Sequence, residues 1–284
     1  SAALYGVVSG QGGGLGTVHL ARLLRDEGIT RFCVNTVAQA EQLRESGFET
    51  EEILMLHSTV DREELERLVD LNVVCTISSV DTGLALNALA ENRSTVAEAH
   101  IQVDTGLGFG GFLISEPEKI LLAYRSLPNV ALSGIYTQLH AVTGKSQEVD
   151  RQLEQFQQVL EAIHKAGFET GTVHAAGSFA LMHFDNARLD AVRAGSAILG
   201  RCRRTKGDGL TVVGCGEASI TEVRWLPKGH TVGVDRLIPM KKPTRVAVLP
   251  VGYQNGFGVE RPRNRGLLDM WRAWRRSRSR TVRL

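Results

Sequence analysis

The sequence predicts an α/β protein, a (β/α)8 TIM barrel followed by a partial all-β C-terminal domain. Two observations predict this fold. Through residue 200, eight short apolar runs alternate with amphipathic stretches of helical length. After residue 205, β-rich runs follow one another with no helical pattern between them. At 284 residues with 43% apolar content, the chain is long enough for one large core or for two domains.

The eight apolar runs are each predicted to form a buried strand. They are continuously apolar rather than alternating, which is typical of parallel strands covered on both faces. They occupy residues 3–8, 31–35, 53–56, 72–78, 99–104, 131–137, 172–176 and 189–195. Eight strand–helix units in about 200 residues match a closed barrel. An open doubly wound sheet is the alternative, but the sequence lacks the dinucleotide fingerprint that accompanies it.

Six amphipathic stretches between these runs are predicted to be helices. They occupy residues 17–28, 36–47, 61–71, 80–92, 116–127 and 148–167. Several end in glycine, the usual left-handed residue that stops a helix. The segments that begin at Asp61 and Ser115 resemble capped helix starts, with a cap residue followed by acidic side chains.

The chain is predicted to divide into a barrel domain, residues 1–204, and a truncated β-domain, residues 205–284, with a basic C-terminal end. The β-domain contains apolar runs at 210–234 and 245–253, broken by Pro-Lys-Gly and Gly-His turns. Residues 267–278 resemble a short amphipathic helix. The chain begins without Met, directly in a strand pattern, and ends in another, so we expect a fragment.

The composition excludes several classes of function. The formal net charge of +2 gives no case for nucleic-acid binding by the whole molecule. Nine arginines against one acid lie between Arg261 and Arg283, but neither an aromatic platform nor a nucleic-acid motif accompanies them. No apolar run approaches the ~20 residues that span a bilayer, and no metal-site spacing is present. Four scattered cysteines without a CxxC pair favour a reducing, cytosolic setting.

Residues 7–16, "VVSGQGGGLG", leave the first predicted strand and therefore lie at the C-terminal face of the barrel, where such barrels carry their sites. The stretch matches neither the dinucleotide fingerprint nor the P-loop. A glycine-rich turn that opens onto a helix N-terminus can bind an anion through its N–H groups. From the local pattern, a flexible turn and a phosphate site are both open.

Several segments together resemble the alanine racemase family of pyridoxal-phosphate (PLP) enzymes. They are "VVSGQGGGLG", "HIQVDTGLGFGGF", "GIYTQLH", "HAAGSFALM", "VRAGSAILGR", "LPKGHTVGV" and "VAVLPVGYQNGFG". Their order and spacing match over essentially the whole chain. The resemblance implies a barrel, a β-domain, a homodimer and an amino-acid substrate. It also implies a lysine that holds PLP and a tyrosine on the opposite face of the substrate.

The resemblance places Ser9 where the family has its lysine and Val234 where it has the catalytic tyrosine, so no catalytic residue is intact. A serine hydroxyl cannot form an imine, and valine cannot carry a proton. Other polar positions of the family have also changed; here they are Gln11, Gly13, Gln102, Phe109, Gln138 and Gly177. We therefore expect a catalytically impaired relative, a pseudoenzyme.

Four residues match family positions that bind the cofactor. Ser178, Gly195 and Ser196 match phosphate contacts, and Arg193 matches the arginine that faces the pyridine nitrogen. The alternative is that they survive as barrel-rim structure, with Gly195 kept for its turn and Ser178 as a helix cap. In the first case PLP or another small phosphate is bound, at most non-covalently.

Two further functions stay open. One is an active PLP-dependent racemase that uses a lysine not yet placed, such as Lys145 after the sixth strand. The other is a non-catalytic subunit or interaction scaffold, since the family pairs each barrel with the partner's β-domain.

Overall fold

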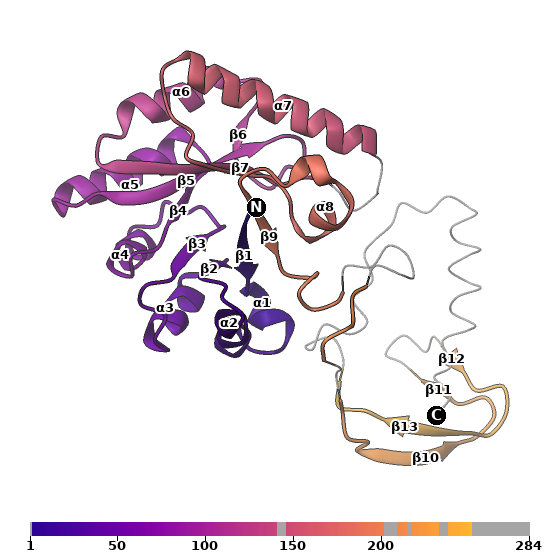
Figure 1. Ribbon diagram of the computed structural model, residues 1–284. Helices are drawn as coiled ribbons and strands as arrows, with labels where there is room; N and C mark the ends of the chain where they lie inside the picture. The colour runs from indigo at the N-terminus through magenta and orange to yellow at the C-terminus, as the bar shows by residue number, and fades with distance from the viewer. Residues whose placement is uncertain (1, 141–145, 202–208, 215–216, 233–237, 252–284) are drawn as a thin grey trace. The chain divides into compact units, whose positions relative to one another are not determined.

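The computed structural model describes residues 2–140, 146–201, 209–214, 217–232 and 238–251 (Figure 1). Contacts within the chain divide it into two compact units, Ser1–Gly214 and Cys215–Leu284. The predicted boundary between residues 204 and 205 falls outside the described residues, and it stays a prediction. The predicted helix at 267–278 and the arginine-rich stretch 261–283 also lie outside them.

Eight parallel strands form the sheet of the first unit, each at the place of a predicted strand. They are β1 (Ala3–Val7), β2 (Arg31–Val34), β3 (Glu52–Met55), β4 (Cys75–Ile77), β5 (Ala97–Asp104), β7 (Val130–Thr137), β8 (Thr172–His174) and β9 (Ala191–Ala194). Their order in the sheet is β3-β2-β1-β9-β8-β7-β5-β4, and the two-residue β6 (Phe112–Leu113) pairs beside β5. The helices lie outside the curled sheet (Figure 1).

The two ends of this order are hydrogen-bonded to each other, because β3 pairs with Val74, the residue directly before β4. Leu54 and Val74 form a parallel bridge. The N–H of Met55 donates to the carbonyl of Val74 at 2.9 Å, and the N–H of Val74 donates to the carbonyl of Ile53 at 2.8 Å. An open doubly wound sheet keeps two unpaired edges, so this closure excludes it. The predicted (β/α)8 barrel is confirmed.

All six predicted helices are present in the first unit. They are α2 (Thr17–Asp26), α3 (Val37–Glu45), α4 (Arg62–Asp70), α5 (Val80–Asn92), α6 (Pro117–Ser126) and α7 (Ser146–Lys165), and the shorter α8 (Ser178–His183) and η2 (Asp185–Ala187) follow. The Asp61 cap is confirmed, because its carboxylate accepts the N–H of Glu64 at 3.0 Å. The Ser115 cap is wrong: α6 starts at Pro117, whose fixed φ suits the first helical position, without a side-chain cap.

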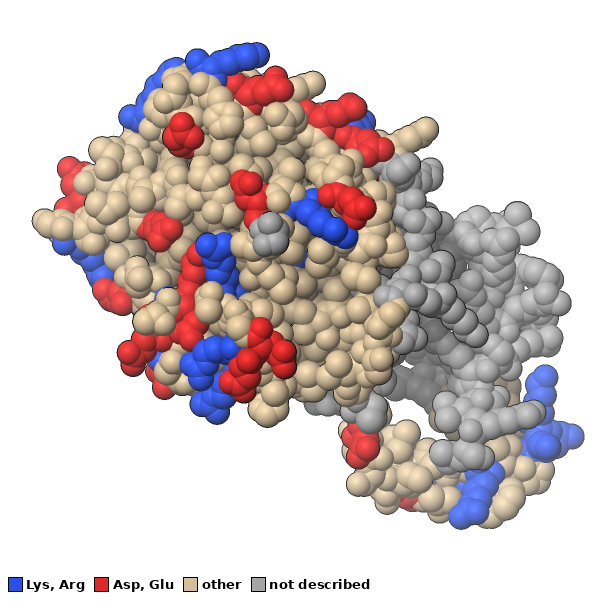
Figure 2. Space-filling model, viewed as in Figure 1, with Lys and Arg blue, Asp and Glu red and all other residues tan. Residues whose placement is uncertain are grey.

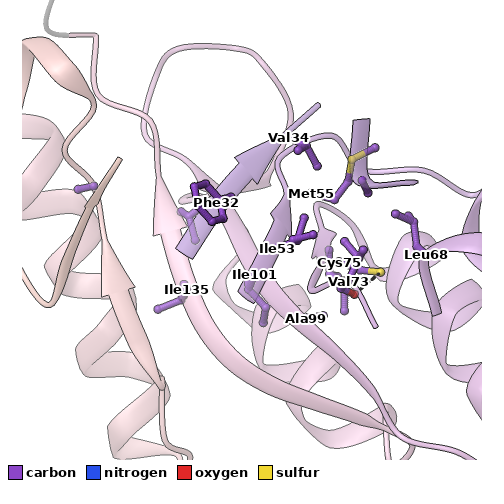
Figure 3. Close-up of a cluster of buried hydrophobic side chains, with 14 of the residues drawn as sticks. Phe32, Val34, Ile53, Met55, Leu68, Val73, Cys75, Ala99, Ile101 and Ile135 are labelled. Carbon is purple, nitrogen blue, oxygen red and sulfur yellow. Dashed lines mark hydrogen bonds between the residues drawn. The ribbon is translucent and has the colours of Figure 1, made fainter. Parts of the chain in front are cut away.

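Side chains of the strands alternate between two layers. One layer faces the helices and is apolar; Figure 3 shows part of it, including Phe32, Ile53 and Ile101. The other layer faces the barrel interior and includes a separate apolar cluster around Tyr5 and Leu54. The continuous apolar pattern therefore describes the outer layer well, whereas several interior positions carry polar side chains.

The described part of the second unit is all-β, as predicted. Strand β10 (Glu222–Leu226) pairs antiparallel with β13 (Thr244–Val248), and β11 (Thr231–Val232) pairs antiparallel with β12 (Ile238–Pro239). Lys228 and Gly229 lie in the turn that follows β10, at the predicted Pro-Lys-Gly break.

The surface of the first unit carries both signs of charge. Figure 2 shows Lys and Arg interspersed with Asp and Glu over the visible face. Among the helices of the described residues, none combines the length and the apolarity that crossing a membrane requires.

Candidate functional site

The glycine-rich stretch after β1 folds into one left-handed turn, α1 (Ser9–Gly13). Gly10, Gln11 and Gly12 have φ angles of 61°, 55° and 57°. The N–H of Gly12 donates to the carbonyl of Val8 at 3.1 Å, and the N–H of Gly16 donates to that of Gln11 at 2.8 Å. Glycine tolerates this backbone without the steric cost that other L-residues have. The stretch is therefore an ordered turn, and several of its N–H groups are already used within it.

Position 13 is crowded for a larger side chain. A Cβ added to Gly13 would overlap Cδ1 of Leu199, and the φ of this residue, +65°, is one that other L-residues rarely adopt. A tyrosine here would strain the backbone and would require the end of the Leu199 side chain to move. Nη1 of Arg201 donates to the carbonyl of Gly13 at 3.0 Å, so the turn after β9 packs directly on the turn after β1.

We expect Gly13→Ala to lower the free energy of unfolding by about 1 kcal/mol more than Gly10→Ala does. Both positions have left-handed φ angles, so both variants share that strain, but a Cβ at Gly10 meets nothing within 4 Å. The difference isolates the overlap with Leu199. Urea unfolding of the two variants measures it, and equal midpoints would show that Leu199 yields freely.

The structure brings the three predicted phosphate contacts together. The N–H of Gly195 donates to Oγ of Ser178 at 2.9 Å, and Ser196 is exposed beside them. Ser178 is not the cap of α8, because Gly177 holds that position and Ser178 is the first helical residue. The predicted cap is therefore wrong, but the wider alternative, that Ser178 and Gly195 are kept as barrel-rim structure, is not contradicted. Ser9 follows the neighbouring strand, since β1 pairs with β9.

Arg193, the predicted pyridine contact, is buried at 3% exposure and its guanidinium is held by the protein itself. Nη1 donates to Nδ1 of His174. Nη2 donates to the carbonyl of Thr137 at 2.7 Å, to Oε1 of Gln138 at 2.9 Å and to the carbonyl of Ala175 at 3.4 Å. Burial lowers the pKa of Arg193, but an arginine keeps its proton in proteins.

The buried charge fixes the tautomers of two histidines. Arginine only donates, so Nδ1 of His174 accepts and its proton sits on Nε2. Nε2 of His174 lies 2.9 Å from Nδ1 of His100 and donates to it. The ring of His174 is stacked between Tyr5 and Tyr136, with centroid distances of 5.5 and 4.9 Å. Arg193, His174 and His100 thus form one hydrogen-bonded chain across the barrel interior.

Both histidines are held neutral. Burial, together with the charges of Arg193 and Arg31, lowers the pKa of His100 to about 4. Burial and the charge of Arg193 lower the pKa of His174 well below its usual value. Tyr136 stacks on the ring of His174 and is itself buried. Burial raises the pKa of Tyr136 to about 12, and its hydroxyl lies 3.1 Å from Oγ1 of Thr76.

The sequence analysis singled out Arg193 and Gln138 but missed His100, Tyr136 and the contact role of His174. A signal was present: His100, Tyr136 and His174 lie on the adjacent strands β5, β7 and β8, each next to an apolar residue that points to the opposite face. Among the other substituted positions, Gln102 is buried and Phe109 is 79% exposed. Val234 and Lys145 lie outside the described residues. In the part of the chain that is described, no three His, Cys, Asp or Glu side chains gather as metal ligands.

These residues fit a phosphate group but not covalently held PLP. Ser178 and Ser196 place hydroxyls and a backbone turn at the barrel mouth. Covalent attachment needs an amine, and the lysines described in the first unit are Lys119, which pairs with Glu116 on α6 at 2.7 Å, and Lys165, the last residue of α7. We therefore assign amine chemistry to none of the described residues of the first unit.

A closed (β/α)8 barrel followed by an all-β unit defines the class of fold to which the chain belongs. The protein-family model described as "Alanine racemase, N-terminal domain" matches residues 1–202, and the model described as "Alanine racemase, C-terminal domain" matches residues 215–270. The chain belongs to the alanine racemase family.

The relatives and solved structures agree with this assignment. The alanine racemase of Carboxydothermus hydrogenoformans is 31% identical over 92% of this chain and 72% of its own length. The alanine racemase of Desulforamulus reducens is 28% identical over 89% of this chain and 70% of its own length. Among solved structures, the alanine racemase from Bacillus anthracis with bound L-Ala-P has a TM-score of 0.76 at 23% identity, over 90% of this chain and 67% of that one. The enzyme from Bartonella henselae with covalently bound pyridoxal phosphate has a TM-score of 0.74 at 22% identity, over 90% and 70%. At these identities the structures show the fold.

Proposed function

We propose that this member of the alanine racemase family does not racemise amino acids and that its barrel mouth binds the phosphate of PLP, or of a similar small molecule, without a covalent bond. The observation that carries the proposal is Ser9. It follows β1 at the rim beside β9, where the resemblance requires an amine, and it supplies a hydroxyl. A hydroxyl does not condense with an aldehyde to an imine.

Retained phosphate binding is supported by the meeting of Ser178, Gly195 and Ser196. Their order along the chain separates Ser178 from the other two by a helix and a strand, yet the Ser178 hydroxyl and the Gly195 N–H are 2.9 Å apart. The Gly195 N–H is used on Ser178, but the hydroxyls of Ser178 and Ser196 keep their own O–H groups to donate, and hydroxyls at such a rim are typical phosphate ligands.

The proposal also covers the cellular compartment, the ligand and the oligomeric state of the protein. Buried, unpaired Cys33 and Cys75 fit a reducing cytosol. The relatives with bound L-Ala-P and with covalent pyridoxal phosphate support an amino-acid or phosphate ligand, and the family resemblance supports a homodimer.

We expect purified protein mixed with one equivalent of PLP to give no stoichiometric adduct at a single residue after borohydride reduction, because no amine stands at the end of β1. Mass spectrometry of the reduced protein measures this. Ser9→Lys is the matched positive control, since it returns an amine to that position, and we expect its adduct to map to residue 9.

A stoichiometric adduct on any lysine of the unaltered chain, Lys145 included, would overturn the proposal. Such a result would favour the alternative of an active racemase with a displaced lysine.

A further inference from the structure

Two side chains from the turn after β9 occupy the space next to Gly13. Cδ1 of Leu199 overlaps the position of a Cβ added to Gly13, and Nη1 of Arg201 lies 3.7 Å from that position. The resemblance places a phosphate-binding tyrosine at residue 13. A methyl group of Leu199 lies where that tyrosine side chain would begin, and the positively charged guanidinium of Arg201 lies beside it.

Arg201 closes the turn that carries the phosphate contacts. Its backbone N–H donates to the carbonyl of Ser196 at 2.8 Å, and its side chain crosses to the carbonyl of Gly13 at 3.0 Å. The guanidinium therefore bridges the turn after β1 and the turn after β9, which contains Gly195 and Ser196. Within the described residues, Gly13 is the one partner of this side chain, which leaves most of its five N–H donors available.

The barrel mouth lacks two positive charges that the resemblance places there. Phe109 and Ser9 stand where the resemblance places an arginine and a lysine. The guanidinium of Arg193 is buried and occupied by acceptors of the protein. Arg201 is exposed at the rim, and a guanidinium matches a phosphate with two parallel hydrogen bonds.

We propose that Arg201 is a phosphate-binding residue of this chain and that it takes the place of the lost tyrosine at position 13. The ligand is a phosphate monoester whose phosphate contacts Arg201, Ser178 and Ser196. This inference rests on the proposed function, because it names a further ligand at the same site.

The test is calorimetric titration of the full chain with pyridoxine 5′-phosphate, with pyridoxine and with inorganic phosphate. Pyridoxine compounds carry no aldehyde, so surface lysines do not react. We expect Arg201→Gln to weaken binding of pyridoxine 5′-phosphate at least tenfold, to weaken inorganic phosphate as well, and to leave pyridoxine unchanged. Arg201→Lys should keep part of the affinity. Arg22→Gln, at an exposed arginine of α2, is the matched control and should bind as the unaltered chain does.

The outcomes separate the two proposals. If Arg201→Gln binds pyridoxine 5′-phosphate normally while Ser178→Ala loses affinity, the role of Arg201 is overturned and the phosphate site stands. If the unaltered chain binds neither pyridoxine 5′-phosphate nor inorganic phosphate, the phosphate site itself is overturned. Thermal melting by circular dichroism checks that each variant is folded.

Discussion

Replacement of Arg193 by alanine is expected to lower the free energy of unfolding by about 3–5 kcal/mol. The side chain is buried at 3% exposure, so its removal leaves a cavity among the strands. It also leaves acceptors without a donor: Nδ1 of His174, the carbonyl of Thr137 and Oε1 of Gln138. Water does not reach an interior of this kind freely, and an unsatisfied buried acceptor is costly. Urea unfolding monitored by far-ultraviolet circular dichroism measures the change.

The matched control for this variant is Arg188→Ala. Arg188 is an arginine at the barrel surface whose ion pair with Asp185 is exposed, and such pairs contribute little, so we expect a change below about 1 kcal/mol. Arg193→Lys should fall between the two, because an ammonium keeps the charge but has fewer donors and no planar fork. A stability of Arg193→Ala close to that of the unaltered chain would show that the chain of hydrogen bonds does not hold the barrel together.

Acidification from pH 7 to pH 5 is expected to destabilise the protein by about 2 kcal/mol through His100, with a further loss in the same direction from His174. The pKa of His100 is lowered to about 4 in the folded barrel, and that of His174 is lowered well below its ordinary value. The unfolded chain takes up a proton on each histidine near its ordinary pKa, while the folded chain does not. The unfolded state therefore binds more protons between these values. The contribution is fully present above the ordinary histidine pKa and is lost as the pH falls towards the folded one.

Urea midpoints at a series of pH values measure this loss. His100→Gln should make the profile less steep, since it removes one of the two groups. His164→Gln is the control: His164 is exposed near the end of α7, and its removal should leave the profile unchanged. A flat profile between pH 7 and pH 5 in the unaltered chain would contradict the neutral, buried state of His100 and His174.

The strands and helices were predictable because their signals are local. The run at 53–56 is apolar and bounded by polar residues, and β3 forms there. The Asp61 cap lies next to the amide that it accepts. The predicted cap at Ser115 was wrong because α6 begins at Pro117. A proline has no backbone N–H, so no cap has to accept a hydrogen bond from it.

The candidate site was predictable in part. The resemblance assigned Ser178, Gly195 and Ser196 to one ligand, and they lie together. The contacts of Gly13 with Leu199 and Arg201 were not predictable, because nearly the whole barrel separates these residues along the chain and the bond exists only once β9 pairs with β1.

By itself, the amino-acid sequence determined the alternation of strands and helices, the all-β character of the later part, and the absence of an amine at residue 9. These follow from the chemistry of each residue and from patterns within a few positions. The closure of β3 on β4, the neutral state of the interior histidines and the placement of Arg201 at the rim arose only from the folded barrel. Each depends on residues distant in the chain coming within hydrogen-bond distance, and burial then determines which groups keep a charge.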